Sequence, residues 1–82
     1  MFYVYIIYSK KLDRYYVCHT EDILQRLVQH NSGISTFTAK ATDWVLMYYF
    51  EFKSRAEASK REMEIKKKKS RKYIEWLIST TQ

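Results

Sequence analysis

The chain has 82 residues, a single cysteine, no proline and a formal net charge of +6 at pH 7. A chain of this length predicts one small domain, residues 1–82, with a thin core. Its apolar fraction of 46% and aromatic fraction of 17% exclude an intrinsically disordered protein. The excess of lysine and arginine favours a polyanionic partner, and nucleic acid is the first candidate.

Cys18 is the only cysteine, which excludes an intramolecular disulfide and a cysteine-rich structural zinc site. A lone thiol indicates a reducing compartment. No apolar stretch approaches the roughly 20 residues that span a bilayer, and the first residues lack the basic start of a secretory signal. We therefore expect a cytoplasmic protein with no membrane partner.

The first expected element is a strand from Phe2 to Tyr8, a run that is almost wholly apolar or aromatic. Such a run is typical of a strand buried on both faces, so we place it at the centre of its sheet. The polar stretch from Ser9 to Arg14 has the length of a hairpin connection and leads into a second strand, Tyr15 to Cys18. The two strands should therefore pair antiparallel.

A helix is expected next, with Thr20 as its N-cap and Gly33 just past its end. Two acidic residues in its first turn suit the positive end of the helix dipole. Its expected apolar stripe consists of Ile23, Leu24, Leu27 and Val28. The segment from Ile34 to Thr42 is rich in serine and threonine without a sustained period, which predicts a loop.

The remaining elements are a third strand, Trp44 to Phe52, and two helices. Ser54 and Glu57 form a capping-box pattern that opens a helix running to about Lys69, and Ser70 starts the last helix. The apolar residues of that last helix are Tyr73, Ile74, Leu77 and Ile78. The order ββαβαα predicts an α/β (α+β) fold, with a small three-stranded, mostly antiparallel sheet flanked by helices.

Two short tyrosine motifs stand on the first two strands, Tyr3-Val4-Tyr5 and Tyr16-Val17-Cys18. The first helix then supplies Arg26 and His30, and the second supplies Glu62. With these residues in this order, the sequence resembles the GIY-YIG nuclease superfamily, specifically its small stand-alone bacterial members. The resemblance covers nearly the whole chain.

Two positions depart from the motifs of that family. Tyr3 and Cys18 stand where the motif glycines are expected. A glycine at a strand end often allows close approach of a ligand, so we expect the Cys18 thiol to crowd a phosphate there.

The resemblance implies phosphodiester hydrolysis around a single divalent cation, Mg²⁺ or Mn²⁺. It implies that Tyr5 is the general base or orients the water, that Tyr16 holds the phosphate or the water, and that Glu62 binds the metal. Arg26 is then the clamp on the phosphate. A free tyrosine is a poor base at neutral pH, so the cation, Arg26 or a hydrogen bond from His30 has to make Tyr5 more acidic.

The residues themselves leave alternatives open. Tyrosines in strands are usually core or interface aromatics, and this interpretation also fits Tyr5 and Tyr16. The helix period puts Arg26 and His30 at the edge of the apolar stripe, where long polar side chains often only snorkel.

Glu62 gives the strongest signal from physics alone, because the spacing of Ala58, Glu62 and Ile65 puts them on one helix face. A carboxylate at a core position needs an arginine, hydrogen bonds or a metal. Pairing with an arginine and ligation of a metal both stay open.

Basic residues outside this set are expected to contact a phosphate backbone, although a lysine run is also typical of a solvated helix end. The expected nucleic-acid contacts are Lys40, Lys66, Lys67, Lys69, Arg71 and Lys72. Such contacts give salt-dependent binding with little sequence preference. We expect Cys18 to pack rather than to carry redox chemistry, and His19 to lie at the surface.

The expected function is a metal-dependent DNA endonuclease that selects branched or nicked structures, with DNA preferred over RNA and a nucleoid-associated location. The alternative is a non-catalytic nucleic-acid-binding module on the same fold. A homodimer, or docking on a repair protein through Tyr73 and Trp76, are further hypotheses for partners.

Overall fold

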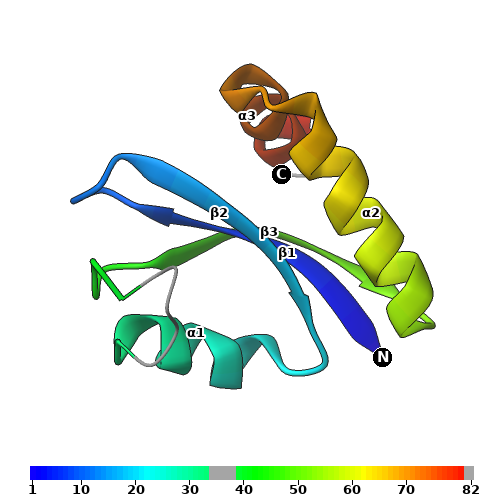
Figure 1. The fold of residues 1–82 in the computed structure, drawn as a ribbon, viewed down its shortest axis with the longest axis horizontal. Helices are drawn as coiled ribbons and strands as arrows, with labels where there is room; N and C mark the ends of the chain where they lie inside the picture. Colours follow the sequence, from blue (N-terminus) through cyan, green and yellow to red (C-terminus); the bar gives the residue numbers. More distant parts are fainter. Residues whose placement is uncertain (34–38, 81–82) are drawn as a thin grey trace.

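The structure is a computed structural model that describes residues 1–33 and 39–80. Over these residues the chain forms β1 (Phe2–Ser9), β2 (Arg14–Thr20), α1 (Ile23–Asn31), β3 (Val45–Phe52), α2 (Arg55–Lys68) and α3 (Arg71–Thr80) (Figure 1). This is the predicted order ββαβαα, and the α+β fold class is confirmed.

The sheet of the described residues has the strand order β2-β1-β3, and both pairings are antiparallel. The central place of β1 confirms the prediction from its apolar run, since residues 4–7 have no exposed surface. Tyr5 pairs with Cys18 on one side and with Tyr49 on the other. β2 is therefore an edge strand, and the two tyrosine motifs lie side by side.

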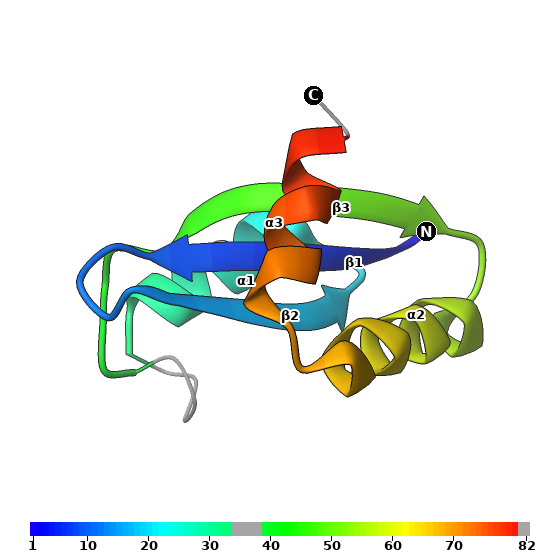
Figure 2. The ribbon, with the colours of Figure 1, turned by 90° about the horizontal axis from the view of Figure 1, so that it is seen from above.

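The helices lie on opposite faces of the sheet. Figure 1 shows α1 on one face, and Figure 2 shows α2 and α3 together on the other. Successive side chains of a strand point to opposite faces. Tyr5 and Tyr16 accordingly face α1, whereas Val4 and Val17 face α2 and α3.

The face covered by α2 and α3 is a hydrocarbon core. The buried helix residues in it are Ala58, Ile65, Leu77 and Ile78. Ser54 caps α2, because its hydroxyl accepts a hydrogen bond from the Glu57 N–H at 3.2 Å and donates one to the Glu57 carboxylate at 3.0 Å. These bonds confirm the helix start predicted from the capping pattern.

The start of α1 differs from the prediction. Asp22, not Thr20, is the N-cap, and its carboxylate accepts a hydrogen bond from the Gln25 N–H at 3.0 Å. Thr20 is the last residue of β2, and its hydroxyl accepts a hydrogen bond from the Asp22 N–H at 3.1 Å. A carboxylate is favoured at this end because the helix dipole attracts negative charge.

The predicted apolar stripe of α1 was wrong at two positions, since Leu24 is 76% exposed and Val28 is 68% exposed. Ile23 and Leu27 pack against the sheet as predicted. The helix meets the sheet along a narrow side only, and His30 is its buried residue.

Asn31 fastens the end of α1 to the start of β3. Its side chain donates to the Trp44 carbonyl at 3.0 Å and accepts from the Trp44 N–H at 2.7 Å. Gly33 follows with a φ of 79°, which confirms the glycine predicted past the helix end. Residues 34–38 of the predicted loop lie outside the described residues. None of the described helices has the length and apolar character needed to cross a bilayer.

Candidate active site

Tyr5 and His30 form a buried polar pair between β1 and the last turn of α1. The Tyr5 hydroxyl lies 2.7 Å from Nε2 of His30, and neither residue has exposed surface. A histidine is stable inside this core because its polar atom finds a partner there. His30 therefore lies deeper than the edge position expected from the helix period.

Burial controls the protonation of this pair. It raises the pKa of Tyr5 far above its ordinary value, and the Cys18 thiol adds to the rise while Arg26 opposes it. Burial and the Arg26 guanidinium lower the pKa of His30 to about 4. At neutral pH both groups are uncharged, and the tautomer of the imidazole decides whether Nε2 donates or accepts the hydrogen bond with the Tyr5 hydroxyl.

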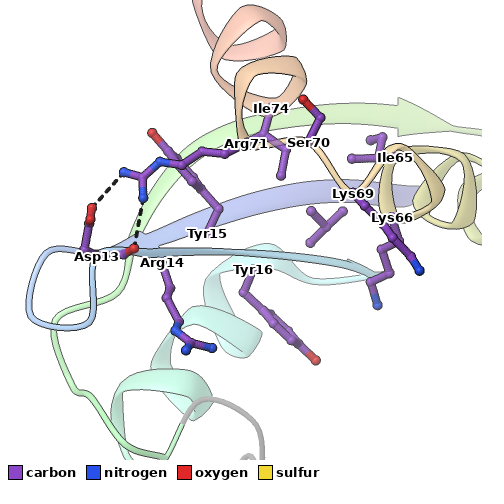
Figure 3. A pocket seen from close by; sticks show the side chains of 11 residues that line it. Asp13, Arg14, Tyr15, Tyr16, Ile65, Lys66, Lys69, Ser70, Arg71 and Ile74 are labelled. Carbon is purple, nitrogen blue, oxygen red and sulfur yellow. Dashed lines mark hydrogen bonds and ion pairs between the residues drawn. The ribbon is translucent and has the colours of Figure 1, made fainter.

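Tyr16 connects the buried pair to the edge of the sheet. Its ring lies edge-on to His30 with the centroids 5.7 Å apart, and the Lys66 ammonium is 5.7 Å from the centroid of the same ring. Burial raises the pKa of Tyr16, and Cys18 adds to the rise while Lys66 opposes it. The side chain is half-buried, and Figure 3 shows its hydroxyl pointing away from β2.

Glu62 is held by two side chains beside β2. Nδ1 of His19 lies 2.6 Å from Oε1, and Nζ of Lys66 donates to Oε2 at 2.8 Å. Burial acts to raise the pKa of this carboxyl, but the hydrogen bonds from Lys66 and His19 outweigh burial and lower the pKa. Because the side chain keeps 15% exposure, the ionised carboxylate is sheltered but accessible.

His19 is a member of the candidate site that sequence reasoning missed. The expectation of a surface residue was wrong, because His19 is half-buried against Glu62. The alternation of side chains along a strand could have identified His19, because it lies two residues after Val17 and so points to the same face of the sheet, the face that α2 covers. In the described part of the chain, the side chains that hold Glu62 are a histidine and a lysine rather than an arginine.

Arg26 is half-buried at the side of α1 that faces the motifs. Its guanidinium donates to the Gln29 side chain at 2.8 Å and interacts with the Tyr5 hydroxyl and the Cys18 thiol. The structure thus brings the predicted residues into one connected group. Its members are Tyr5, Tyr16, Arg26, His30 and Glu62.

Glu62 is also the predicted metal ligand. Among residues 1–33 and 39–80, no group of three or more His, Cys, Asp or Glu side chains is placed to hold a metal ion. A single ionised carboxylate nevertheless fits Mg²⁺ or Mn²⁺, because Mg²⁺ keeps several waters and is bound by one or two carboxylates together with substrate phosphates. A cation at Oε2 has to take the place of the Lys66 ammonium.

The lysine run at the end of α2 divides between two surfaces. Lys66 and Lys69 line an open groove along β2 (Figure 3). Lys67 lines a different hollow on α2, beside Lys60. The predicted nucleic-acid contacts in this run therefore do not form one surface.

The other predicted basic residues are exposed. Lys40 lies in a turn and Lys72 on α3, both accessible to solvent. The Arg71 guanidinium donates to the Asp13 carboxylate at 2.7 Å and to the Glu75 carboxylate at 3.3 Å. Its charge is therefore largely neutralised within the protein.

Comparison with known proteins assigns the family. The model of the GIY-YIG catalytic domain matches residues 1–74 of the 82-residue chain. No curated protein and no solved structure matches this chain. The matched residues include both tyrosine motifs, α1 and Glu62. The chain therefore belongs to the GIY-YIG catalytic domain family, whose activity is nuclease-type hydrolysis of phosphodiester bonds in nucleic acid.

Proposed function

We propose that residues 1–82 form a single domain that acts as a divalent-cation-dependent DNA endonuclease. One observation carries the proposal: the Tyr16 ring contacts both the buried histidine and the lysine that holds Glu62. Arg26 also interacts electrostatically with Tyr16, so a phenol, a guanidinium and a carboxylate are grouped around this ring. Phosphodiester hydrolysis needs these groups to orient water, clamp the phosphate and hold a cation.

In this proposal the scissile phosphate lies over Tyr16, Arg26 and Glu62, the half-buried members of the group. Arg26 clamps the phosphate through its guanidinium, which stays charged at any working pH. Glu62 would hold Mg²⁺ or Mn²⁺, and such a cation would supply stabilisation of the charge on the phosphoryl oxygens. The Tyr16 hydroxyl orients the attacking water by a hydrogen bond.

Tyr5 and His30 are assigned a supporting role. Neither has exposed surface, and a phenol with a raised pKa is a weak base at neutral pH. Their hydrogen bond fixes the imidazole ring against which Tyr16 packs. A general-base role for Tyr5 stays a prediction, and it requires the hydroxyl to become both accessible and more acidic.

We further propose selection of branched or nicked DNA rather than of a base sequence. A domain of this size has little surface with which to read base edges, and phosphate contacts carry no sequence information. A homodimer, or docking on a repair protein, would extend the footprint. Trp76 supports a docking surface on α3, because it is 56% exposed and stacks on Tyr73 with the centroids 5.8 Å apart.

The second candidate function is a non-catalytic nucleic-acid-binding module. Lys66 favours it, because its ammonium already occupies Oε2 of the carboxylate that would hold the cation. Cys18 favours it as well, since a thiol stands beside Tyr5 where the family motif has glycine. In this alternative the basic surface binds DNA while no bond is cleaved.

Nicking of supercoiled plasmid and of branched oligonucleotides, with Mg²⁺ or Mn²⁺, tests the proposal. The wild-type chain is expected to cleave, and Glu62→Ala, Tyr16→Phe and Arg26→Ala are expected to lose cleavage because each removes a group at the phosphate. Tyr5→Phe distinguishes the two roles considered for Tyr5. A general base predicts loss of cleavage in this variant, whereas a supporting role predicts partial activity. Lys60→Ala, which changes an exposed charge on the same helix, controls for purification and for net charge.

Two results would reject the enzyme. Cleavage that survives in all three variants indicates a contaminating nuclease. Salt-sensitive DNA binding by a folded wild-type chain that never cleaves supports the binding module.

A further inference from the structure

The groove along β2 adjoins the residues grouped around Tyr5 and Arg26. It has a volume of about 420 Å³ and lies between the edge strand β2 and the junction of α2 with α3 (Figure 3). Tyr16 and Lys66 line it, and both also belong to the candidate active site. A polymer bound at the active site can therefore continue directly into the groove.

The groove is strongly basic. Arg14 lines one end, at the start of β2, while Lys66 and Lys69 line the other, at the end of α2 (Figure 3). Its acidic residue, Asp13, already forms an ion pair with Arg71 at 2.7 Å. Within residues 1–33 and 39–80, Arg14 and Lys69 form no ion pair, so their charges are available to an anion.

Lys69 stands at a position where the backbone favours another residue. It is the C-cap of α2 and has a φ of 47°, in the left-handed region that glycine or asparagine adopts most easily. A lysine there carries backbone strain. Its charged side chain lies beside the groove, at the point where the chain turns into α3.

The aromatic rings of the groove are not arranged for stacking of bases. The Arg71 guanidinium covers the Tyr15 ring at 5.2 Å from its centroid, and the Lys66 ammonium covers the Tyr16 ring at 5.7 Å. Cations at both ends together with covered rings suit phosphates rather than bases.

We propose that this groove binds the sugar–phosphate backbone of the DNA next to the scissile phosphate, with Arg14 and Lys69 each contacting one phosphate. The inference rests on the proposed function for its ligand, and it adds two contacts outside the motifs, Arg14 and Lys69, to a groove that Tyr16 also lines. Arg14 is a contact that the sequence analysis did not identify. Lys67 is left outside the site because it lies on another surface of α2.

The test is fluorescence anisotropy of a short fluorescein-labelled duplex DNA, titrated at several salt concentrations in EDTA. The variants are Arg14→Gln, Lys69→Asn and the double variant, with Lys60→Gln as the matched loss of an exposed charge on α2. Asparagine tolerates the left-handed backbone of position 69, so this variant is expected to fold. Circular dichroism checks that it does.

The logarithm of the DNA association constant falls linearly with the logarithm of the salt concentration. Each single groove variant is expected to make this slope shallower by about 1, and the double variant by about 2, because one phosphate contact is lost per substitution. Lys60→Gln is expected to leave the slope unchanged. Equal slopes for wild type and double variant, an equal reduction by Lys60→Gln, or no binding by the wild type would each overturn the groove proposal.

The assay separates this inference from the proposed enzyme, because binding in EDTA needs no cleavage. A chain that never cleaves but shows the reduced slopes supports the groove and rejects the endonuclease. A chain that cleaves with unchanged slopes keeps the endonuclease and rejects the groove.

Discussion

The two faces of the sheet are built differently. The face under α2 and α3 is a mainly aliphatic core with aromatic residues packed against it, whereas the face under α1 contains a tyrosine hydrogen-bonded to a histidine with no exposed surface. Burial of hydrocarbon stabilises the fold without fixing the orientation of any one side chain, whereas a buried hydrogen-bonded pair holds its two rings in one orientation. The first face therefore supplies stability, and in the proposed function the second positions the candidate catalytic side chains.

The faces meet at the edge of β2. Tyr16 reaches this edge from the α1 side, and Glu62 with His19 reaches it from the α2 side. Lys66 joins them through its ion pair with Glu62 and its contact with the Tyr16 ring. A site at an edge strand uses residues of both faces without opening either core.

The largest expected effect is on the hydrocarbon face. Ile65→Ala is expected to lower the free energy of unfolding by about 4 kcal/mol, because a side chain that is 1% exposed leaves a cavity. Leu24→Ala, on the outer side of α1, is expected to cost less than about 0.5 kcal/mol. Urea unfolding followed by circular dichroism measures both, and similar costs would contradict the contrast between the buried and exposed positions.

The polar face is expected to be sensitive to acid. The pKa of His30 is about 4 in the folded chain against 6.5 without burial, so between these values the unfolded chain takes up a proton that the folded chain does not. The free energy of unfolding therefore has its full value above pH 6.5 and falls by roughly 3 kcal/mol as the pH drops to about 4.

Urea unfolding at several pH values measures this loss. His30→Gln is expected to be less stable at pH 7 but to have a shallower dependence on pH, because the titrating group is gone. His19→Gln is the matched control, since it removes the other histidine and leaves His30 in place. If the free energy of unfolding of His30→Gln depends on pH as steeply as that of the wild type, a group other than His30 titrates.

At the meeting edge, Lys66→Met is expected to strengthen Mn²⁺ binding about fivefold, or by roughly 1 kcal/mol, because the ammonium that competes for Oε2 is removed. Electron paramagnetic resonance of free Mn²⁺ measures the affinity. Lys60→Met removes a lysine elsewhere on α2 and should change nothing. Weaker binding in Lys66→Met would mean that the ion pair instead organises the carboxylate for the metal.

The smallest expected effect is at Cys18. Cys18→Gly and Cys18→Ala are both expected to raise a weak cleavage rate by a few-fold, since each removes a thiol beside Tyr5 and Arg26. Single-turnover cleavage of branched DNA measures the rate. Unchanged or lower rates in both variants would remove the steric argument about this position.

Sequence patterns predicted those elements whose signals are local. The apolar run of β1 predicted a central strand, and the serine and glutamate at the start of α2 predicted its cap. The N-cap of α1 was wrong because Thr20 and Asp22 are both capable caps, and only the end of β2 decides between them.

Sequence patterns predicted the candidate site residues but not the side chains that contact them. Motif order predicted Tyr5, Tyr16 and Glu62, yet the lysine on the Glu62 carboxylate depends on how α2 crosses the sheet edge. The groove depends on the turn between α2 and α3, which brings Lys69 to the same groove as Arg14 across a large sequence separation. Such contacts arise from tertiary packing and have no local signature.

Binding of Mn²⁺ to Glu62 tests the central claim, that the two faces meet in a metal-dependent site. Electron paramagnetic resonance titrations compare wild type with Glu62→Gln and with Glu64→Gln, which removes an exposed carboxylate two residues away on α2. We expect specific binding in wild type and Glu64→Gln and its loss in Glu62→Gln. Equal binding by all three chains, with DNA present or absent, would contradict Glu62 as the metal ligand and with it the proposed nuclease site.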